Sequence, residues 1–313
     1  MLRTLLTFSL AAAGALLTAQ DQPPLRAVLV TGASSGIGRT TAELLAKEGF
    51  FVYAGARKQA DLDALNALAN VQAVRLDVTV AADIDAAVAT VRAGGRGLHG
   101  LINNAGIAVM QPLIELTDKD LVFQFDVNVF GPVRVTRAFA PLLLESKGRV
   151  LTTGSLSGTV CWPLGGPYCM SKHAVEAFTD VLAAELKPFG VQVGVVQPGN
   201  YRSEIMLNMQ ERLKTGGYSA EGSRYERRMA ELLRAPADRA QYPEPDDVAA
   251  AYLRALRDDT MQRRYLVVPN QREAEITLRA ALARIAEMNA TQRFAFTRDE
   301  LIGMLDDALA HAK

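Results

Sequence analysis

A tyrosine and a lysine stand four positions apart in the segment GPYCMSKHAVEAF, residues 166–178. Positions i and i+4 of a helix share one face, so Tyr168 and Lys172 can reach the same small volume. The lysine ammonium would favour the phenolate and lower the tyrosine pKa from about 10, which suits a general acid or base near neutral pH. The alternative is a packed tyrosine beside a surface lysine, and the spacing alone does not separate the two.

A glycine-rich turn precedes this pair in the chain. The segment TGASSGIG follows a short apolar run and opens a helical pattern, which is the setting of a phosphate-binding turn. Gly32, Gly36 and Gly38 have no side chains, so the backbone can turn sharply and approach a pyrophosphate. The spacing differs from the common G-x-G-x-x-G fingerprint, and the alternative is a tight turn without a ligand. The position between a strand and a helix favours nucleotide binding.

The residues that follow the second apolar run indicate which nucleotide binds. An NAD site places a carboxylate about 20 residues past the glycines, whereas an NADP site places an arginine nearby. This chain has Ala56, Arg57 and Lys58 there. A guanidinium can bind the 2′-phosphate through two hydrogen bonds, so the sequence predicts NADP(H) in preference to NAD(H). The alternative is a solvated basic turn.

Short apolar runs alternate with helical patterns from residue 26 onward, and these elements must position the polar residues. Strands are expected within 26–32, 50–57, 71–78, 100–106, 148–155, 191–199 and 263–270, and helices over 36–48, 81–95, 117–145 and 168–189. Such alternation predicts a parallel sheet covered by helices on both faces. The expected fold class is therefore α/β, a doubly wound, Rossmann-like domain.

The chain divides into one catalytic domain and a C-terminal extension. We expect the domain over residues 26–270 and a helical extension over 271–313. Residues 200–242 are rich in Arg, Met and Gly and have no strand pattern. A long excursion of this kind in a compact domain predicts a lid over the substrate site, and we expect this lid to be helical. Near the C-terminus, Thr297 and Glu300 have the spacing of a capping box at the start of the last helix.

The first twenty residues differ from the rest of the chain. Residues 1–20 combine a basic Arg3, an apolar run and small residues that suit a cleavage site. This pattern predicts a signal peptide or a short anchor, and hence export or membrane association through the N-terminus. The run is shorter than the roughly 20 residues of a spanning helix. The alternative is a cytoplasmic protein with an apolar arm or a mis-assigned start.

Charge and cysteine content exclude two classes of site. Lys plus Arg number 34 and Asp plus Glu number 34, so the balance gives no sign of a nucleic-acid partner. The two cysteines, Cys161 and Cys169, are too few for a disulfide framework and wrongly spaced for zinc. We therefore expect a small-molecule substrate and no metal site.

Several short motifs occur in a consistent order along the chain. They are TGASSGIG, NNAG at 103–106, the Asn128 of FDVNVFG, the Ser155 of VLTTGSLSG, YCMSK at 168–172, and PGN at 198–200. Together they resemble the classical short-chain dehydrogenase/reductase family over residues 26–200. Residues 168–200 look most like the branch that acts on retinol and 17-hydroxysteroids.

The resemblance implies a role for each residue of the catalytic set. Tyr168 would exchange the proton of the alcohol or carbonyl, and Lys172 would hold the nicotinamide ribose and keep Tyr168 acidic. Ser155 would bind the substrate oxygen, and Asn128 would hold a water in a proton relay behind Lys172. The hydride chemistry would belong to the nicotinamide, while the protein supplies orientation and electrostatics.

The resemblance also implies the cofactor site. Asp77 would contact the adenine, and Asn104 would line the cofactor groove. Where the family often has a threonine that binds the nicotinamide carboxamide, the nearest hydroxyl here is Ser203. The predicted set is Gly32, Ser34, Ser35, Gly36, Ile37, Gly38, Arg57, Asp77, Asn104, Ala105, Gly106, Lys172, Pro198, Gly199 and Ser203.

Apolar residues surround the expected substrate position. They precede Tyr168 and begin the expected lid: Val160, Trp162, Leu164, Ile205, Met206 and Met209. A pocket walled in this way prefers a lipophilic alcohol or ketone. The alternative is that these side chains only pack beneath the lid.

The sequence therefore predicts an NADP-dependent oxidoreductase that interconverts a secondary alcohol and a ketone or aldehyde, with a steroid- or retinoid-like substrate. One alternative is a nucleotide-sugar epimerase or dehydratase, which shares Tyr-x-x-x-Lys; the three-residue gap after Gly32 argues against it. Another is a non-catalytic NADP-sensing protein, which predicts a damaged catalytic set that this chain does not have. The family resemblance further implies a homodimer or homotetramer.

Overall fold

Seven parallel strands form one sheet in the order β3-β2-β1-β4-β5-β6-β7 in the computed structural model, which describes residues 25–311. Most strands are short runs of buried apolar residues, as expected for a parallel sheet covered on both faces. The predicted doubly wound α/β fold is confirmed. The strands are β1 (Ala27–Val30), β2 (Phe51–Ala56), β3 (Val71–Arg75), β4 (Gly100–Asn103), β5 (Arg149–Thr153), β6 (Gln192–Pro198) and β7 (Arg264–Val267).

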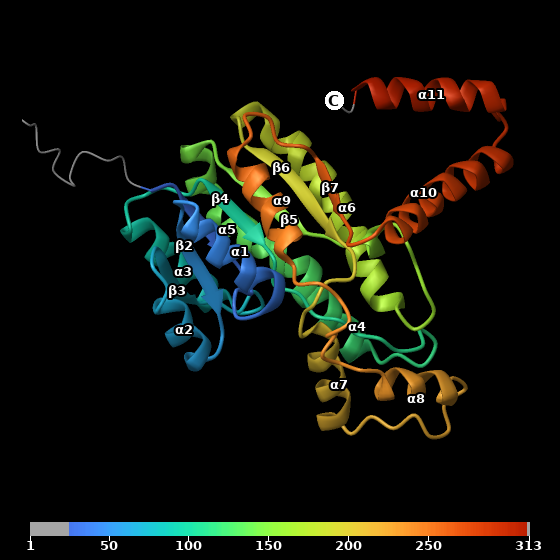
Figure 1. The fold of residues 1–313 in the computed structure, drawn as a ribbon, viewed down its shortest axis with the longest axis horizontal. Coiled ribbons are helices and arrows are strands. Elements are labelled where there is room, and N and C mark those ends of the chain that lie inside the picture. The colour runs from blue at the N-terminus through green and yellow to red at the C-terminus, as the bar shows by residue number, and fades with distance from the viewer. Residues whose placement is uncertain (1–24, 312–313) are drawn as a thin grey trace, which may run out of the picture.

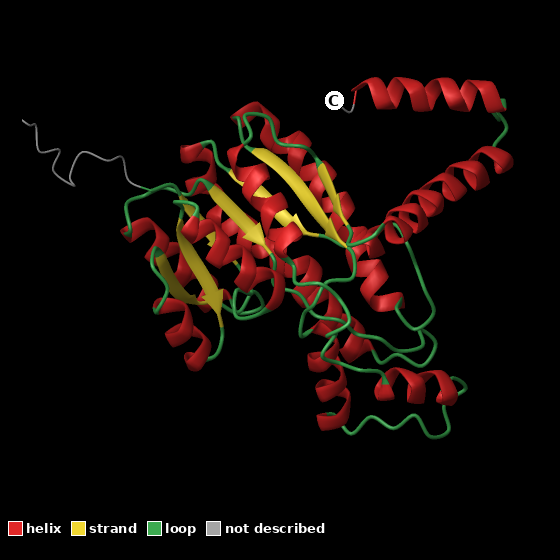
Figure 2. Cartoon of the chain, viewed as in Figure 1, coloured by secondary structure: helices red, strands yellow, loops and turns green. Residues whose placement is uncertain are grey.

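Helices cover both faces of this sheet, and Figure 2 shows the strands between the two layers. Each layer buries its own apolar cluster against the sheet. Burial of these clusters is the main favourable term in folding. One layer consists of α1 (Gly36–Lys47), α2 (Gln59–Asn66) and α9 (Asp246–Arg257), and the other of α3 (Ala81–Ala93), α5 (Gly131–Ser146) and α6 (Gly166–Leu186).

The helices differ from the sequence prediction in two ways. Helices α2 and α9 were not predicted, although two aspartates in the first turn of α9 suit a helix N-terminus. The helical pattern over 117–145 divides into α4 (Asp118–Phe125), a π-helical turn (Asp126–Phe130) and α5. Pro132 lies in the first turn of α5, where a missing N–H costs little. The interruption therefore falls where a new helix can begin.

The segment 200–242 forms two helices, α7 (Ile205–Thr215) and α8 (Glu226–Arg234). Figure 1 shows them near α4, beyond the ends of the strands. Arg212 Nη1 donates to Asp120 Oδ1 at 2.6 Å, and Ser223 Oγ donates to Glu115 Oε2 at 2.6 Å. These contacts fix the segment to α4 and to the loop before it. Its role as a lid remains a prediction.

Two helices, α10 (Gln271–Thr291) and α11 (Arg298–His311), complete the described chain and extend away from the sheet in Figure 1. The predicted capping box is confirmed: Thr297 N donates to Glu300 Oε2 at 2.7 Å, and Glu300 N donates to Thr297 Oγ1 at 3.3 Å. Within residues 25–311, no helix is long and apolar enough to cross a membrane. The signal-like segment 1–20 lies outside the described residues.

Candidate active site

The carboxyl ends of β1, β4, β5 and β6 open on one cavity of about 710 Å³. The strand order reverses between β1 and β4, and ligands of open α/β sheets bind at such a point. Every residue of the predicted site except Asn128 lines this cavity. They are Gly32, Ser34, Ser35, Gly36, Ile37, Gly38, Arg57, Asp77, Asn104, Ala105, Gly106, Ser155, Tyr168, Lys172, Pro198, Gly199 and Ser203.

The glycine turn between β1 and α1 has no room for side chains. Gly32 has a left-handed φ of 64°, and a Cβ added to it would lie 2.8 Å from Cα of Ala105. A Cβ on Gly38 would lie 2.2 Å from the carbonyl oxygen of Gly32. Ser35, which precedes α1, makes no side-chain cap hydrogen bond to the first turn. The N–H groups of that turn are left to bind an anion, so the turn fits the pyrophosphate of a dinucleotide.

Asn104 joins this turn to two other strands. Its Nδ2 donates to the carbonyl oxygens of Thr31 and Gly32, each at 3.1 Å. Its Oδ1 accepts a hydrogen bond from Thr153 Oγ1 at 3.1 Å. The side chain that was predicted to line the cofactor groove therefore also fixes the glycine turn against the ends of β4 and β5.

Ser155 follows β5 and is held by its neighbour Ser157. Ser157 N donates to Ser155 Oγ at 3.1 Å, and Ser155 Oγ donates to Ser157 Oγ at 2.9 Å. Both side chains are buried. Because the backbone of Ser155 is extended and the short helix Leu156–Gly158 follows at once, its hydroxyl stays at the edge of the sheet.

Tyr168 and Lys172 face the same volume near the start of α6, as predicted. Lys172 Nζ lies 5.6 Å from the centroid of the Tyr168 ring and donates to the carbonyl oxygen of Thr153 at 2.7 Å. Lys172 is only 6 % exposed. A buried lysine is rare unless it is paired or has a function, so the alternative of a surface lysine is wrong.

The pKa values of this pair do not follow the sequence prediction. Burial raises the pKa of Tyr168, while the Ser155 hydroxyl and the positive charge of Arg239 act in the opposite direction. Burial also lowers the pKa of Lys172 to about 8, and the negative charge of Glu176 opposes this shift. The expected net lowering of the Tyr168 pKa is therefore wrong for this structure. Desolvation of the phenol outweighs the hydrogen bond from Ser155 and the positive charge of Arg239.

Asn128 lies in the π-helical turn, behind the cavity wall. Its Nδ2 donates to the carbonyl oxygen of Ile107 at 3.0 Å and to Ser171 Oγ at 3.2 Å, and its Oδ1 accepts from Ile107 N at 2.9 Å. Gln124, one turn earlier, also contacts Ile107 and Ser171. Asn128 therefore binds the segment after β4 and the residue beside Lys172, and its predicted water relay remains a prediction.

Arg57 and Asp77, which were predicted to contact the adenosine part of the cofactor, line the cavity together. Arg57 Nη1 lies 3.7 Å from Asp77 Oδ2, and its side chain is 65 % exposed. Burial would raise the pKa of Asp77, but two hydrogen bonds from Thr79 and the charge of Arg57 lower it below its ordinary value. The exposed guanidinium is free to turn toward a phosphate.

The substrate end of the cavity is apolar. Val160 and Trp162 line it from the segment before α6, while Leu164 does not and adopts a left-handed φ of 70°. Ser203 lies against the glycine turn, since a Cβ on Gly36 would lie 3.3 Å from Cβ of Ser203. The remaining apolar lining includes Met110, Phe123, Leu156, Ile205, Met206, Met209 and Ile276.

Two charged residues near the catalytic pair were missed at the sequence level. Glu176 is four residues after Lys172 on α6, and it forms an ion pair with Arg264 at 2.9 Å. Helical spacing would have found Glu176. Arg239 lines the cavity from the segment after α8, and no motif or spacing in the sequence connects it with Tyr168.

Comparison with known proteins agrees with this geometry. The sequence model of the short chain dehydrogenases matches residues 26–214. The chain belongs to the short-chain dehydrogenase family. This short-chain dehydrogenase is 38 % identical over 200 residues to rat mitochondrial D-beta-hydroxybutyrate dehydrogenase, which covers 60 % of the chain and 58 % of the rat protein. It is 38 % identical over 192 residues to human 17-beta-hydroxysteroid dehydrogenase type 6, with 60 % of each covered. The predicted family and branch are confirmed.

Solved structures give the same family and fold. A short-chain dehydrogenase from Burkholderia phymatum in complex with NAD has a TM-score of 0.72 and 27 % identity, over 84 % of this chain and 96 % of that one. A short-chain dehydrogenase from Burkholderia cenocepacia in complex with NADP has a TM-score of 0.65 and 27 % identity, over 85 % and 96 %. The matched part of this chain spans less than two thirds of the length of the rat and human relatives.

The burial of Lys172 predicts a pH-dependent cost to stability. Its pKa falls from 10.5 to about 8 on folding, so the cost is complete below pH 8 and disappears above pH 10.5. The melting temperature of Lys172→Met minus that of the wild type should therefore be larger at pH 7 than at pH 10.5, by at least about 2–4 °C. Differential scanning calorimetry at the two pH values measures this difference.

The matched control is Lys187→Met, because Lys187 is exposed at the end of the same helix. If Lys172→Met and Lys187→Met respond equally to pH, the burial of Lys172 does not disfavour its charge. The pKa assignment would then be wrong.

Proposed function

We propose that this short-chain dehydrogenase is an NADP-dependent oxidoreductase that interconverts a secondary alcohol and a ketone or aldehyde. One observation carries the proposal: Tyr168, buried Lys172 and Ser155 meet in the cavity that the glycine turn opens. A phenol, an ammonium and a hydroxyl gathered in one partly desolvated space can exchange a proton with a bound oxygen and stabilise the charge that forms on it.

The cavity fits a nicotinamide dinucleotide. Gly32 and Gly38 leave space at the N-terminus of α1 for a pyrophosphate, and Ser203 lies beside the same turn. Asp77 would face the adenosine and Lys172 the nicotinamide ribose, and both residues line this cavity. When bound, the nicotinamide supplies or accepts the hydride. Residues of this chain hold the dinucleotide and exclude water around the reacting oxygen.

The proton transfer belongs to Tyr168. In carbonyl reduction, its phenol O–H donates a proton to the carbonyl oxygen, while Ser155 Oγ donates a hydrogen bond to the same oxygen. Alcohol oxidation reverses both steps, and the phenolate accepts the proton. Burial raises the pKa of Tyr168, so the phenol is in the protonated form that carbonyl reduction requires.

Lys172 is the next group along the proton path. Its Nζ is fixed to the carbonyl oxygen of Thr153, and its pKa of about 8 allows it to give up a proton near neutral pH. Asn128 positions Lys172 indirectly, through Ser171 and Ile107. In this proposal the water relay would begin at Lys172 and pass along that wall.

The NADP preference rests on Arg57. No carboxylate stands at the end of β2, where the sequence reads Ala56, Arg57, Lys58. The nearby Asp77 Oδ2 is 3.7 Å from Arg57 Nη1 and does not hold the guanidinium closely. A 2′-phosphate offers that guanidinium stronger, charge-assisted hydrogen bonds.

The substrate is proposed to carry a lipophilic body. The similar rat and human proteins are named for hydroxybutyrate and hydroxysteroid, both secondary alcohols. The apolar lining around Trp162 and Met206 supports a substrate with more carbon than polar surface.

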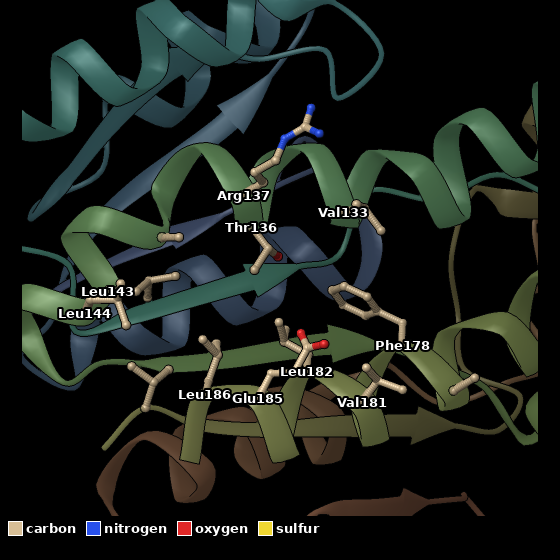
Figure 3. A pocket seen from close by; sticks show the side chains of 13 residues that line it. Val133, Thr136, Arg137, Leu143, Leu144, Phe178, Val181, Leu182, Glu185 and Leu186 are labelled. Atoms are coloured by element: carbon tan, nitrogen blue, oxygen red, sulfur yellow. The ribbon is translucent and has the colours of Figure 1, made fainter. Parts of the chain in front are cut away.

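A second copy of this chain is proposed to pack on α5 and α6. Figure 3 shows an apolar groove between these helices, on the face of the sheet opposite α1 and α9, with Val133 and Val181 on its sides. Val181 is 57 % exposed and Val133 is 40 % exposed, so apolar side chains on both sides of the groove face solvent. Arg137 of α5 and Glu185 of α6 also line the groove, so a two-fold axis along it can bring the arginine of one copy near the glutamate of the other.

Tyr168→Phe tests the proposed chemistry. Removing the phenol O–H should lower kcat roughly 10²- to 10⁴-fold with every active substrate, because the phenol supplies the proton that is transferred to the reacting oxygen. Steady-state kinetics on a panel of ketones, followed by NADPH absorbance, measure the loss. Tyr218→Phe is the control, because Tyr218 does not line the cavity. Full turnover by Tyr168→Phe would remove the basis of the proposal.

Arg57→Ala tests the cofactor preference. The loss of its contact with the 2′-phosphate should raise KM for NADPH roughly 10- to 100-fold and change KM for NADH little. Lys58→Ala removes the same charge from the next residue, which does not line the cavity, and should leave both values near wild type. Equal effects of the two variants would assign the preference to general charge.

Val181→Glu tests the interface. A charge on the groove should convert an oligomer to a monomer in size-exclusion chromatography with light scattering, because burying it unpaired is costly. Val80→Glu is the control, since Val80 is exposed and lies outside the groove. A monomeric wild-type protein, or an oligomer that Val181→Glu leaves intact, would contradict this interface.

A further inference from the structure

Arg239 occupies an unusual backbone conformation at the edge of the active-site cavity. Its φ is 53°, in the left-handed region that favours glycine. A bulky residue held there costs free energy and persists where the surrounding structure or the function requires it. The contacts of the Arg239 guanidinium are therefore the first place to look for the reason that this backbone conformation is kept.

The guanidinium is held in place by three neighbours. Nε donates to the carbonyl oxygen of Tyr201 at 3.0 Å, and Nη2 donates to Asn200 Oδ1 at 2.9 Å. The ring of Tyr242 lies 4.4 Å from Cζ and stacks against the guanidinium plane. Within residues 25–311, Nη1 has no acceptor. The group is thus oriented in advance, with donors left over.

No carboxylate of the described chain lies within 4.0 Å of Arg239. Arg212, the other arginine on this side of the cavity, is paired with Asp120 at 2.6 Å. Glu273 is near enough to act on the charge of Arg239, but its oxygens accept from Asn200 N, Asn200 Nδ2 and Asn270 Nδ2. Arg239 therefore brings a positive charge to the cavity without a bonded counter-charge.

This charge is felt at the catalytic tyrosine. Arg239 lowers the pKa of Tyr168 against the larger effect of burial, and Tyr168 acts on Arg239 in return. Both side chains line the same cavity. A substrate whose oxygen meets Tyr168 can therefore extend to Arg239.

We propose that Arg239 binds a carboxylate of the substrate, so that the preferred substrates are hydroxy acids and oxo acids with an apolar chain. This inference rests on the proposed alcohol–ketone chemistry. The planar fork of arginine matches the two oxygens of a carboxylate and forms charge-assisted hydrogen bonds with them. A neutral substrate of the same shape leaves the cation unpaired.

The rest of the cavity agrees with an amphiphilic substrate. Ile205, Met206 and Ile276 line the same cavity as Arg239 and offer only apolar contact. An acid with an aliphatic chain can pair its carboxylate with Arg239 and bury its chain against these side chains. Arg212 also lines the cavity, but Asp120 at 2.6 Å balances its charge, and Lys172 donates to the carbonyl oxygen of Thr153.

The test compares acids with their esters. The probes are 2-, 3-, 4- and 5-oxooctanoate and their methyl esters, assayed with NADPH. In the wild type, kcat/KM for the best acid should exceed that of its ester by about 10- to 100-fold. Arg239→Gln should remove this ratio by raising KM for the acid, with the ester changed by less than about threefold, and Arg239→Lys should restore part of it.

The matched control is Arg202→Gln. Arg202 belongs to the same segment but is 52 % exposed, pairs with Glu244 at 2.7 Å and does not line the cavity. Arg202→Gln should leave unchanged the ratio of kcat/KM for the acid to kcat/KM for its ester. Melting temperatures of all variants show that each one is folded.

Binding supplies a readout that needs no turnover. Titration calorimetry in the presence of NADP⁺ should give octanoate a 10- to 100-fold weaker affinity for Arg239→Gln than for the wild type, with octanol unchanged. If neither acids nor esters are reduced but octanoate still depends on Arg239, the proposed reaction is wrong and the carboxylate site stands. If acids and esters react equally, or if Arg239→Gln changes only the affinity for NADPH, the carboxylate site is wrong.

Discussion

All seven strands of the sheet run in one direction, so every segment that follows a strand emerges at the same edge. The glycine turn, Asn104 and Ser155 lie far apart in sequence but leave neighbouring strands β1, β4 and β5. Asn104 then joins them by direct hydrogen bonds to the turn and to Thr153. The order of the strands thus brings the segments of the site together, and side-chain hydrogen bonds then fix them to one another.

The protein stabilises the ammonium group of Lys172, at the centre of this edge, less well than water would. Lys172 is buried against Thr153 and Tyr168, and the nearest negative charge, that of Glu176, is shared with Arg264. A buried charge lowers the stability of the fold, so such a charge is usually kept only where it serves a function. The same desolvation makes the Tyr168 phenol a weaker acid than the sequence predicted. Both shifts come from one cause, the apolar walls of the cavity.

Local sequence patterns correctly predicted those features that depend on residues close together in the chain. The strands, the glycine turn and the Tyr168–Lys172 face follow from periodicity within a few residues, and the family motifs added Ser155 and Asp77. Arg239 could not be found in this way, because its relation to Tyr168 exists only when residues after α8 fold back over the cavity. The direction of the Tyr168 pKa also could not be predicted, since it depends on burial that no motif describes. Leu164 does not line the cavity, and its left-handed backbone was not predicted either.

The π-helical turn at 126–130 has a consequence for how the two ends of a long helix are aligned. Such a turn holds one residue more than the α-helical ladder on either side of it, and one residue corresponds to about 100° of rotation about the axis. Gln124 and Asn128 both contact Ile107 and Ser171, although α5 keeps its own apolar face on the sheet. The extra residue therefore rotates α5 relative to the turns before it. Gln124 and Asn128 can face Ile107 and Ser171 while the apolar face of α5 still packs on the sheet. The extra residue offsets the rotation of the helical turns that contact Ser171, beside Lys172, from that of α5, which packs in the core.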